Sequence, residues 1–191
     1  MGDVGHRAGR RLLAGQENAE PVEPRQGAIE LLHGGGTRRA ATPAEVYEMR
    51  ADPAFRARVC EAMDTVRHDI AIDGVDDSLT VTVDMVQHTK GMPSFAKKVV
   101  GDETRVIQTE RWESVVCGHI EVEIPGKPGH IRGTLSLTAE GEGSVYCFDG
   151  EAKISIPLIG GKLEGLIEKL FTEGMDTEQR VAAEWLEGVR R

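Results

Sequence analysis

The spacing of hydrophobic residues along the chain changes from the period of a strand to that of a helix. Between Val66 and Ile156 apolar residues alternate with polar ones, a period of two that is typical of strands with one buried face. The predicted strands are Val66–Ile72, Leu79–Met85, Thr104–Trp112, Val115–Ile124, Ile131–Ala139 and Ser144–Ile156, the last with a bulge expected at Gly150. Beyond Pro157 one helical stripe forms from Leu163, Leu166, Ile167, Leu170, Phe171, Val181 and Trp185.

Shorter elements are predicted before this region and within it. Ala28–Leu32 is expected to be a short strand. Thr42 and Asp52 each stand before a proline, which is the pattern of a capping residue followed by the first helical position. They predict helices at Pro43–Arg50 and from Pro53 to about Met63, and a third short helix is expected from Pro93 to Val100.

Short turns between consecutive strands indicate an antiparallel meander. The predicted fold class is α+β, with a curved antiparallel sheet of about six to seven strands wrapped on a long C-terminal helix, and two short helices after the first strand. One domain is expected over residues 28–191. Residues 1–27 are rich in Gly, Arg, Glu and Pro and are expected to form a disordered tail.

Charge and hydropathy narrow the classes of partner. A net charge of -9 disfavours nucleic acid, and equally an anionic membrane surface, as the main partner. No apolar run reaches the ~20 residues that a membrane span needs. The apolar part of Arg10–Gly15 is too short for an export signal, so a cytoplasmic location is expected.

The three cysteines, Cys60, Cys117 and Cys147, are far apart in the sequence and include no Cys-x-x-Cys pair. Reduced thiols are expected, and a single disulfide between Cys117 and Cys147 is the alternative.

No catalytic, metal-binding or cofactor-binding motif is complete. His33-Gly34-Gly35-Gly36 resembles an esterase oxyanion loop, but the chain has no Gly-x-Ser-x-Gly nucleophile elbow. The histidines lack metal-ligand spacing, and Gly160-Gly161-Lys162 lacks the rest of a phosphate loop. We therefore expect no metal and no cofactor, and the sequence leans away from an enzyme.

Several segments of the chain resemble a known family, among them Thr42-Pro43-Ala44-Glu45-Val46-Tyr47 with Asp52-Pro53-Ala54-Phe55. The others are Gly91-Met92-Pro93 with its following helix, Gly126-Lys127-Pro128 leading to Gly133-Thr134-Leu135, and Ile156-Pro157-Leu158-Ile159-Gly160-Gly161-Lys162-Leu163-Glu164. From about Ala40 to Leu186 the chain resembles the helix-grip fold of the START and polyketide cyclase-like (SRPBCC) superfamily, and within it the actinobacterial family of domain of unknown function 2505. One departure is Gly34-Gly35-Gly36-Thr37-Arg38-Arg39, where that family has an apolar first strand.

The resemblance implies a hydrophobic cavity and carries over no catalytic residue, because the family's activity is unassigned. Our hypothesis is non-catalytic binding or transport of a hydrophobic small molecule, lipid or polyketide-like, between the sheet and the C-terminal helix. The residues expected to line the cavity are Val81, Val83, Met85, Trp112, Ile120, Val122, Leu135, Leu137, Tyr146, Phe148, Leu163, Leu166, Ile167 and Leu170. Tyr146, Gln108 and Lys162 are candidates for orienting the ligand, and Trp in place of Val83 or Leu135 is expected to fill the cavity.

Two other functions remain open. The first is a cyclase- or aromatase-like enzyme of the same fold, for which Glu110, His88 and Tyr146 are the candidate acids or bases. The second is a partner-binding module, in which a weak first strand at the sheet edge allows pairing between chains. The expected state is a monomer or a weak homodimer.

Overall fold

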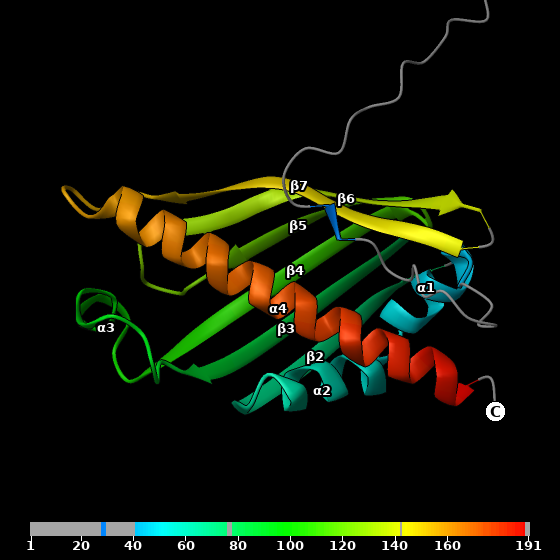
Figure 1. Ribbon diagram of the computed structural model, residues 1–191, viewed down its shortest axis with the longest axis horizontal. Coiled ribbons are helices and arrows are strands. Elements are labelled where there is room, and N and C mark those ends of the chain that lie inside the picture. The colour runs from blue at the N-terminus through cyan, green and yellow to red at the C-terminus, as the bar shows by residue number, and fades with distance from the viewer. Residues whose placement is uncertain (1–27, 30–40, 76–77, 142, 190–191) are drawn as a thin grey trace, which may run out of the picture.

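Helix α4 lies across the concave face of a curved sheet (Figure 1). The computed structural model describes residues 28–29, 41–75, 78–141 and 143–189, so the whole of the predicted tail and the His33 segment lie outside the described residues. The elements are β1 (Ala28–Ile29), α1 (Pro43–Arg50), α2 (Pro53–Ala62), β2 (Thr65–Val75), β3 (Ser78–His88), α3 (Ser94–Val100), β4 (Glu103–Ser114), β5 (Cys117–Glu123), β6 (Gly129–Glu140), β7 (Gly143–Ile154) and α4 (Gly160–Val189).

The sheet has the order β1-β7-β6-β5-β4-β3-β2, and every neighbouring pair is antiparallel. Strands β2 to β7 are therefore a meander, which confirms the predicted α+β fold class. Strand β1 adds only two residues at the edge, where Ala28 pairs with Cys147. Leu31 and Leu32 of the predicted first strand lie outside the described residues.

Both predicted helix starts are confirmed by their capping hydrogen bonds. The Thr42 hydroxyl accepts a hydrogen bond from the backbone N–H of Glu45, and the Glu45 carboxylate accepts one from the Thr42 N–H at 2.8 Å. Asp52 accepts one from the Ala54 N–H at 2.8 Å. These contacts satisfy N–H groups that the first turn of a helix leaves without partners.

The sheet and α4 enclose two regions of different character. At the end of the sheet near α1 and α2, the second half of α4 packs tightly, with Val181, Ala182 and Leu186 buried in the main core. The opposite end is formed by the turn 63–64 and by segments 89–102, 124–128 and 155–162, which contain α3 and the first residues of α4. We call this the α3 end.

The register of the strands fixes which residues face α4. One row of paired inward positions runs Val81, Glu110, Ile120, Gly133 and Gly150. The next row toward the α3 end runs Val83, Gln108, Val122, Ile131 and Ala152. The row on the other side contains Leu79, Trp112, Gly118, Leu135 and Phe148, all in the direction of the core.

Gly150 sits in an unbroken ladder, so the bulge predicted there is wrong. It pairs with Gly133, and the ring of Phe148 covers both: a Cβ at Gly150 would lie 2.5 Å from Phe148 Cζ, and one at Gly133 would lie 2.3 Å from Phe148 Cε2. The same ring packs against Phe171 of α4, with 4.8 Å between ring centroids. The two glycines therefore create the space in which this aromatic ring joins the sheet to the helix.

The alternative disulfide is excluded by the register. Cys117 pairs with Ser136, and Ser136 pairs with Cys147, so strand β6 separates the two cysteines. Two strand spacings amount to about 9.5 Å, beyond the ~4.4–6.8 Å between Cα atoms that a disulfide spans. All three cysteines are free, and burial raises the pKa of the Cys60 thiol to about 11.

A methyl group at Gly150 should destabilise the protein, whereas one at Gly165 should not. Gly150→Ala places Cβ against Phe148 and the carbonyl oxygen of Arg132, and overpacking of this kind costs about 1–3 kcal/mol. Gly165→Ala is the control, because its Cβ meets nothing within 4 Å and alanine favours the helix by roughly 0.5–1 kcal/mol. Chemical denaturation measures both; equal effects would contradict the packing described.

Candidate functional site

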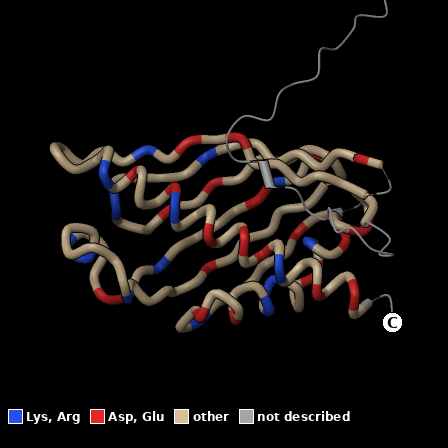
Figure 2. The backbone as a smooth tube through the Cα atoms, in the orientation of Figure 1, with Lys and Arg blue, Asp and Glu red and all other residues tan. Residues whose placement is uncertain are grey.

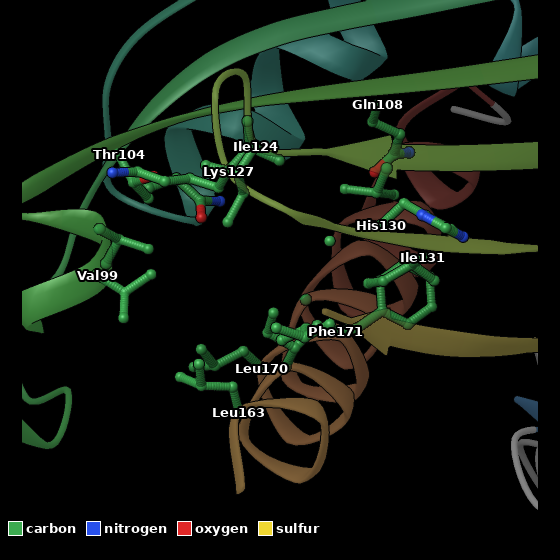
Figure 3. Close-up of a pocket in the computed structure, with 18 of the residues that line it drawn as sticks. Val99, Thr104, Gln108, Ile124, Lys127, His130, Ile131, Leu163, Leu170 and Phe171 are labelled. Carbon is green, nitrogen blue, oxygen red and sulfur yellow. The ribbon is translucent and has the colours of Figure 1, made fainter. Parts of the chain in front are cut away.

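A cavity of about 180 Å³ lies between the first half of α4 and the sheet, at the α3 end. Figure 3 shows Leu163 and Leu170 of α4 on one side of the space, with Val99 of α3 and Thr104 of β4 on the other. The lining is mostly aliphatic and includes four methionines. Its members are Met63, Met85, Gln87, Met92, Val99, Val100, Thr104, Val106, Gln108, Val122, Ile124, Lys127, Pro128, Gly129, His130, Ile131, Ile154, Ile156, Leu163, Ile167, Leu170, Phe171, Gly174, Met175 and Glu178.

The cavity exists because α4 spans more of the sheet than the tight core fills. Its lining residues follow one face of α4 from Leu163 to Glu178, and just beyond them Val181 begins the packed contacts of the core. At the outer rim Lys127 and Pro128 are exposed, and Leu170 is 36 % exposed. The space therefore reaches the surface at the α3 end and is closed by side chains toward the core.

Gln108 and Glu178 stand at the inner, core-side end of the cavity. Glu178 is a member of a buried charge cluster, and Gln108 contacts that cluster. This cluster consists of Arg50 of α1, Arg56 of α2, Glu110 of β4 and Glu178 of α4. It joins four elements that are distant in sequence.

Glu110, which is 0 % exposed, is the centre of the cluster. Its carboxylate accepts hydrogen bonds from Arg50 at 2.9 Å and from two nitrogens of Arg56 at 2.8 Å each. Trp112 Nε1 donates at 3.0 Å and Gln108 Nε2 at 2.9 Å. Five donors converge on one carboxylate, which satisfies the hydrogen-bonding capacity that a buried charge requires.

The four charges of the cluster balance. Burial alone would raise the pKa of Glu110, but the attraction of Arg50 and Arg56 outweighs it and holds that pKa well below its usual range. Burial alone would lower the pKa of Arg50, but Glu110 and Glu178 outweigh it and raise that pKa. The Arg50 guanidinium also lies 4.1 Å from the centroid of the Tyr146 ring, a cation–π contact. The formal charges of the two arginines and the two glutamates sum to zero.

Two acceptor oxygens at the cavity's inner end are left over. Arg50 donates to Glu178 Oε1, and Arg56 lies 3.9 Å from the same oxygen. Within the described part of the chain, Glu178 Oε2 and the side-chain oxygen of Gln108 accept no hydrogen bond. Glu178 is 8 % exposed and lines the cavity, so this end of an apolar space presents acceptors without matching donors.

The predicted lining residues divide between the cavity and the core. Met85, Val122, Leu163, Ile167 and Leu170 line the cavity. Val81, Val83, Trp112, Ile120, Leu135, Leu137 and Tyr146 are buried in the core, and Phe148 packs against Phe171. Leu166 is half-buried outside the lining. Trp in place of Val83 or Leu135 would therefore overpack the core instead of filling the cavity.

Among the polar candidates, Gln108 lines the cavity, whereas Tyr146 and Lys162 do not. The three groups considered as acids or bases also lie outside the lining. Glu110 is covered by its five donors, Tyr146 is buried under Arg50, and His88 lies 3.7 Å from Glu103 at the sheet surface. Nothing in this arrangement brings an acid or base among these three to a ligand.

Sequence reasoning missed Arg50, Arg56 and Glu178. One signal was present for Glu178: it follows Phe171 by seven residues and precedes Val181 by three, which places it on the apolar stripe of α4. A carboxylate on that stripe requires a buried cation nearby. The two arginines carry no comparable signal, because helices α1 and α2 are short and lack a clear apolar face.

In the described segments of the chain no three His, Cys, Asp or Glu side chains gather as metal ligands. None of the described helices combines the length and apolar character needed to cross a membrane.

The stability of the protein should fall in acid because of Glu110. A lowered pKa in the folded state stabilises the fold above the unfolded-state pKa of about 4.3, and this contribution is lost as pH falls. We expect the free energy of unfolding to decrease below about pH 5. Glu110→Gln should lower the free energy of unfolding by about 3–5 kcal/mol at neutral pH, and in this variant that free energy should depend less steeply on pH in acid. The control Glu123→Gln alters an exposed carboxylate and should keep the acid dependence of the unmodified protein. If the free energy of unfolding of Glu110→Gln fell with pH as steeply as that of the unmodified protein, this role of Glu110 would be contradicted.

Two mycobacterial proteins resemble the chain in sequence, and one solved structure resembles it in fold. The uncharacterized proteins Rv0481c of Mycobacterium tuberculosis and Mb0491c of Mycobacterium bovis are each 27% identical over 168 residues, which cover 84% of this chain and 91% of theirs. The crystal structure of TTHA0849 from Thermus thermophilus matches with a TM-score of 0.56 at 18% identity, over 79% of this chain and 93% of that one, and this likeness concerns the fold alone. The family described as "Protein of unknown function (DUF2505)" matches residues 37–186, and the chain belongs to that family.

Proposed function

We propose that this protein binds or transports, without catalysis, a hydrophobic small molecule in the cavity under the first half of α4. The observation that carries the proposal is a mostly aliphatic cavity that reaches the surface at one end and meets unused polar acceptors at the other. A lipid or polyketide-like compound has this combination of an apolar body and a polar end. The resemblance to the START and polyketide cyclase-like superfamily supports the same interpretation.

The size and lining of the cavity are consistent with such a ligand. An engineered apolar cavity of about 150 Å³ holds benzene, and this one, at about 180 Å³, is larger and also open at its rim. Apolar surface removed from water contributes about 25 cal/mol per Å². The methionines Met63, Met85, Met92 and Met175 add flexible side chains that adjust to ligands of different shape.

The inner end favours a ligand with a hydrogen-bond donor. Glu178 Oε2 and the side-chain oxygen of Gln108 are acceptors, and a hydroxyl group would donate to either. A ligand carboxylate would instead add a negative charge to a cluster whose charges already balance, beside Glu178 in a desolvated place. We therefore assign the ligand the class of long-chain or polycyclic alcohols in preference to fatty acids.

A tryptophan at Ile167 should block binding by occupying the cavity. Ile167→Trp adds volume at a lining position of α4. The fluorescent probe N-phenylnaphthylamine should therefore bind this variant at least about tenfold more weakly than it binds the unmodified protein. Thr172→Trp is the matched control, because Thr172 is exposed on the same helix and should leave affinity unchanged. Probe binding that is equally strong in Ile167→Trp and the unmodified protein would place the ligand elsewhere.

The polar end should distinguish decanol from decanoate. The unmodified protein should bind decanol more tightly, since Glu178 accepts a hydroxyl hydrogen bond and repels a carboxylate. Glu178→Gln leaves the cluster with a net positive charge and should shift the preference toward decanoate by about tenfold. Calorimetric titration measures both ligands on both proteins. A preference that Glu178→Gln leaves unchanged would refute the assigned ligand class without bearing on apolar binding itself.

A further inference from the structure

The α3 end carries five of the protein's seven lysines. Segments 89–102, 124–128 and 155–162 contain Lys90, Lys97, Lys98, Lys127 and Lys162 and one acidic residue, Asp102, while Asp64, Glu103 and Glu123 border the same end. This excess of positive charge occurs in a chain with a net charge of -9. Figure 2 shows several blue segments, alongside red ones, at the left-hand end, where these segments of the chain lie.

These lysines differ from the remaining two in their contacts. Lys153 lies 2.8 Å from Glu151, and Lys169 lies 3.7 Å from Glu173. None of the five loop lysines forms an ion pair with another residue that the structure describes. Lys90, Lys98, Lys127 and Lys162 are also exposed, so their charges are available to a partner.

An apolar side chain projects from the same end. Leu158, between β7 and α4, is fully exposed, with a relative accessibility of 101 %, and its neighbour Pro157 is exposed as well. The φ angle of Leu158 is 69°, in the left-handed region of backbone conformation. Gly and Asn adopt this region more easily than Leu does. Neither backbone preference nor packing of the chain accounts for a leucine at this position.

We infer that the α3 end is a docking surface for an anionic lipid bilayer. Lysines attract anionic headgroups, and an exposed leucine at the tip of a loop inserts into the boundary between headgroups and acyl chains. The net charge of the whole chain does not oppose this contact, because screening limits electrostatic attraction to about 8–10 Å. What the membrane meets is the local charge of the α3 end.

The position of this surface relates it to the cavity. Lys127 belongs both to the loop lysines and to the cavity lining, and Val99 and Val100 of α3 line the cavity from the loop that carries Lys97 and Lys98. A bilayer bound here would cover the cavity entrance. The inference goes beyond the proposed function, since bilayer docking needs no ligand and can be measured on the empty protein.

Vesicle co-sedimentation of the full chain tests the inference with three single substitutions. Lys98→Glu reverses one loop charge and Leu158→Asn removes the apolar tip while suiting a positive φ. Arg111→Glu is the matched control, because it makes the same change of charge at an exposed position of β4, away from the α3 end. The arginines of residues 1–27 are present in every variant and cancel from the comparison.

The unmodified chain should bind phosphatidylcholine vesicles that contain phosphatidylglycerol and should not bind pure phosphatidylcholine vesicles. Lys98→Glu should weaken binding by at least about fivefold, and Leu158→Asn by about tenfold. Arg111→Glu should retain it. The thermal unfolding midpoint of Leu158→Asn should equal or exceed that of the unmodified chain, which separates lost docking from lost folding. Absence of vesicle binding, or equal losses in Lys98→Glu and Arg111→Glu, would overturn the inference.

Discussion

The ion pairs of Glu110 with Arg50 and Arg56 are the interaction on which the rest of the structure depends. They join two short helices to the centre of the sheet, and Glu178 adds the long helix through Arg50. A fully buried carboxylate is tolerated only when donors surround it, and here five do so. Because removal of one partner leaves an uncompensated charge, these four elements are held in one relative position.

The same cluster separates the core from the cavity. Glu110 stands in the inward row with Gly133 and Gly150, and the neighbouring row toward the α3 end contains Gln108 and begins the cavity lining. On the other side Trp112 and Leu135 are packed in the core. The protein thus fills one half of the space under α4 with side chains and leaves the other half open, with a charged boundary between them.

The sequence predicts which face of each strand is buried, but it does not predict where along the strand the core ends. Alternation in Leu79–Met85 and Ile131–Leu137 placed Val81, Val83 and Leu135 correctly on the inward face, because the strand period is two. Whether such a residue meets another side chain or an empty space depends on which part of α4 lies above it. That depends on long-range contacts such as Arg50 with Glu178, and no local pattern encodes them.

The net charge of the chain is a poor guide to its partners for a related reason. It sums charges over the whole sequence, whereas only the fold determines which of them lie together at one end. Lys98, Lys127 and Lys162 belong to three segments that are separate in the sequence, and the meander of antiparallel strands brings those segments together. An end that combines unpaired lysines, an exposed leucine and the entrance of an apolar cavity has the properties that transfer of a lipid from a bilayer requires. The proposed ligand would then enter with its apolar body along the methionines and its donor toward Glu178, and it would never cross bulk water.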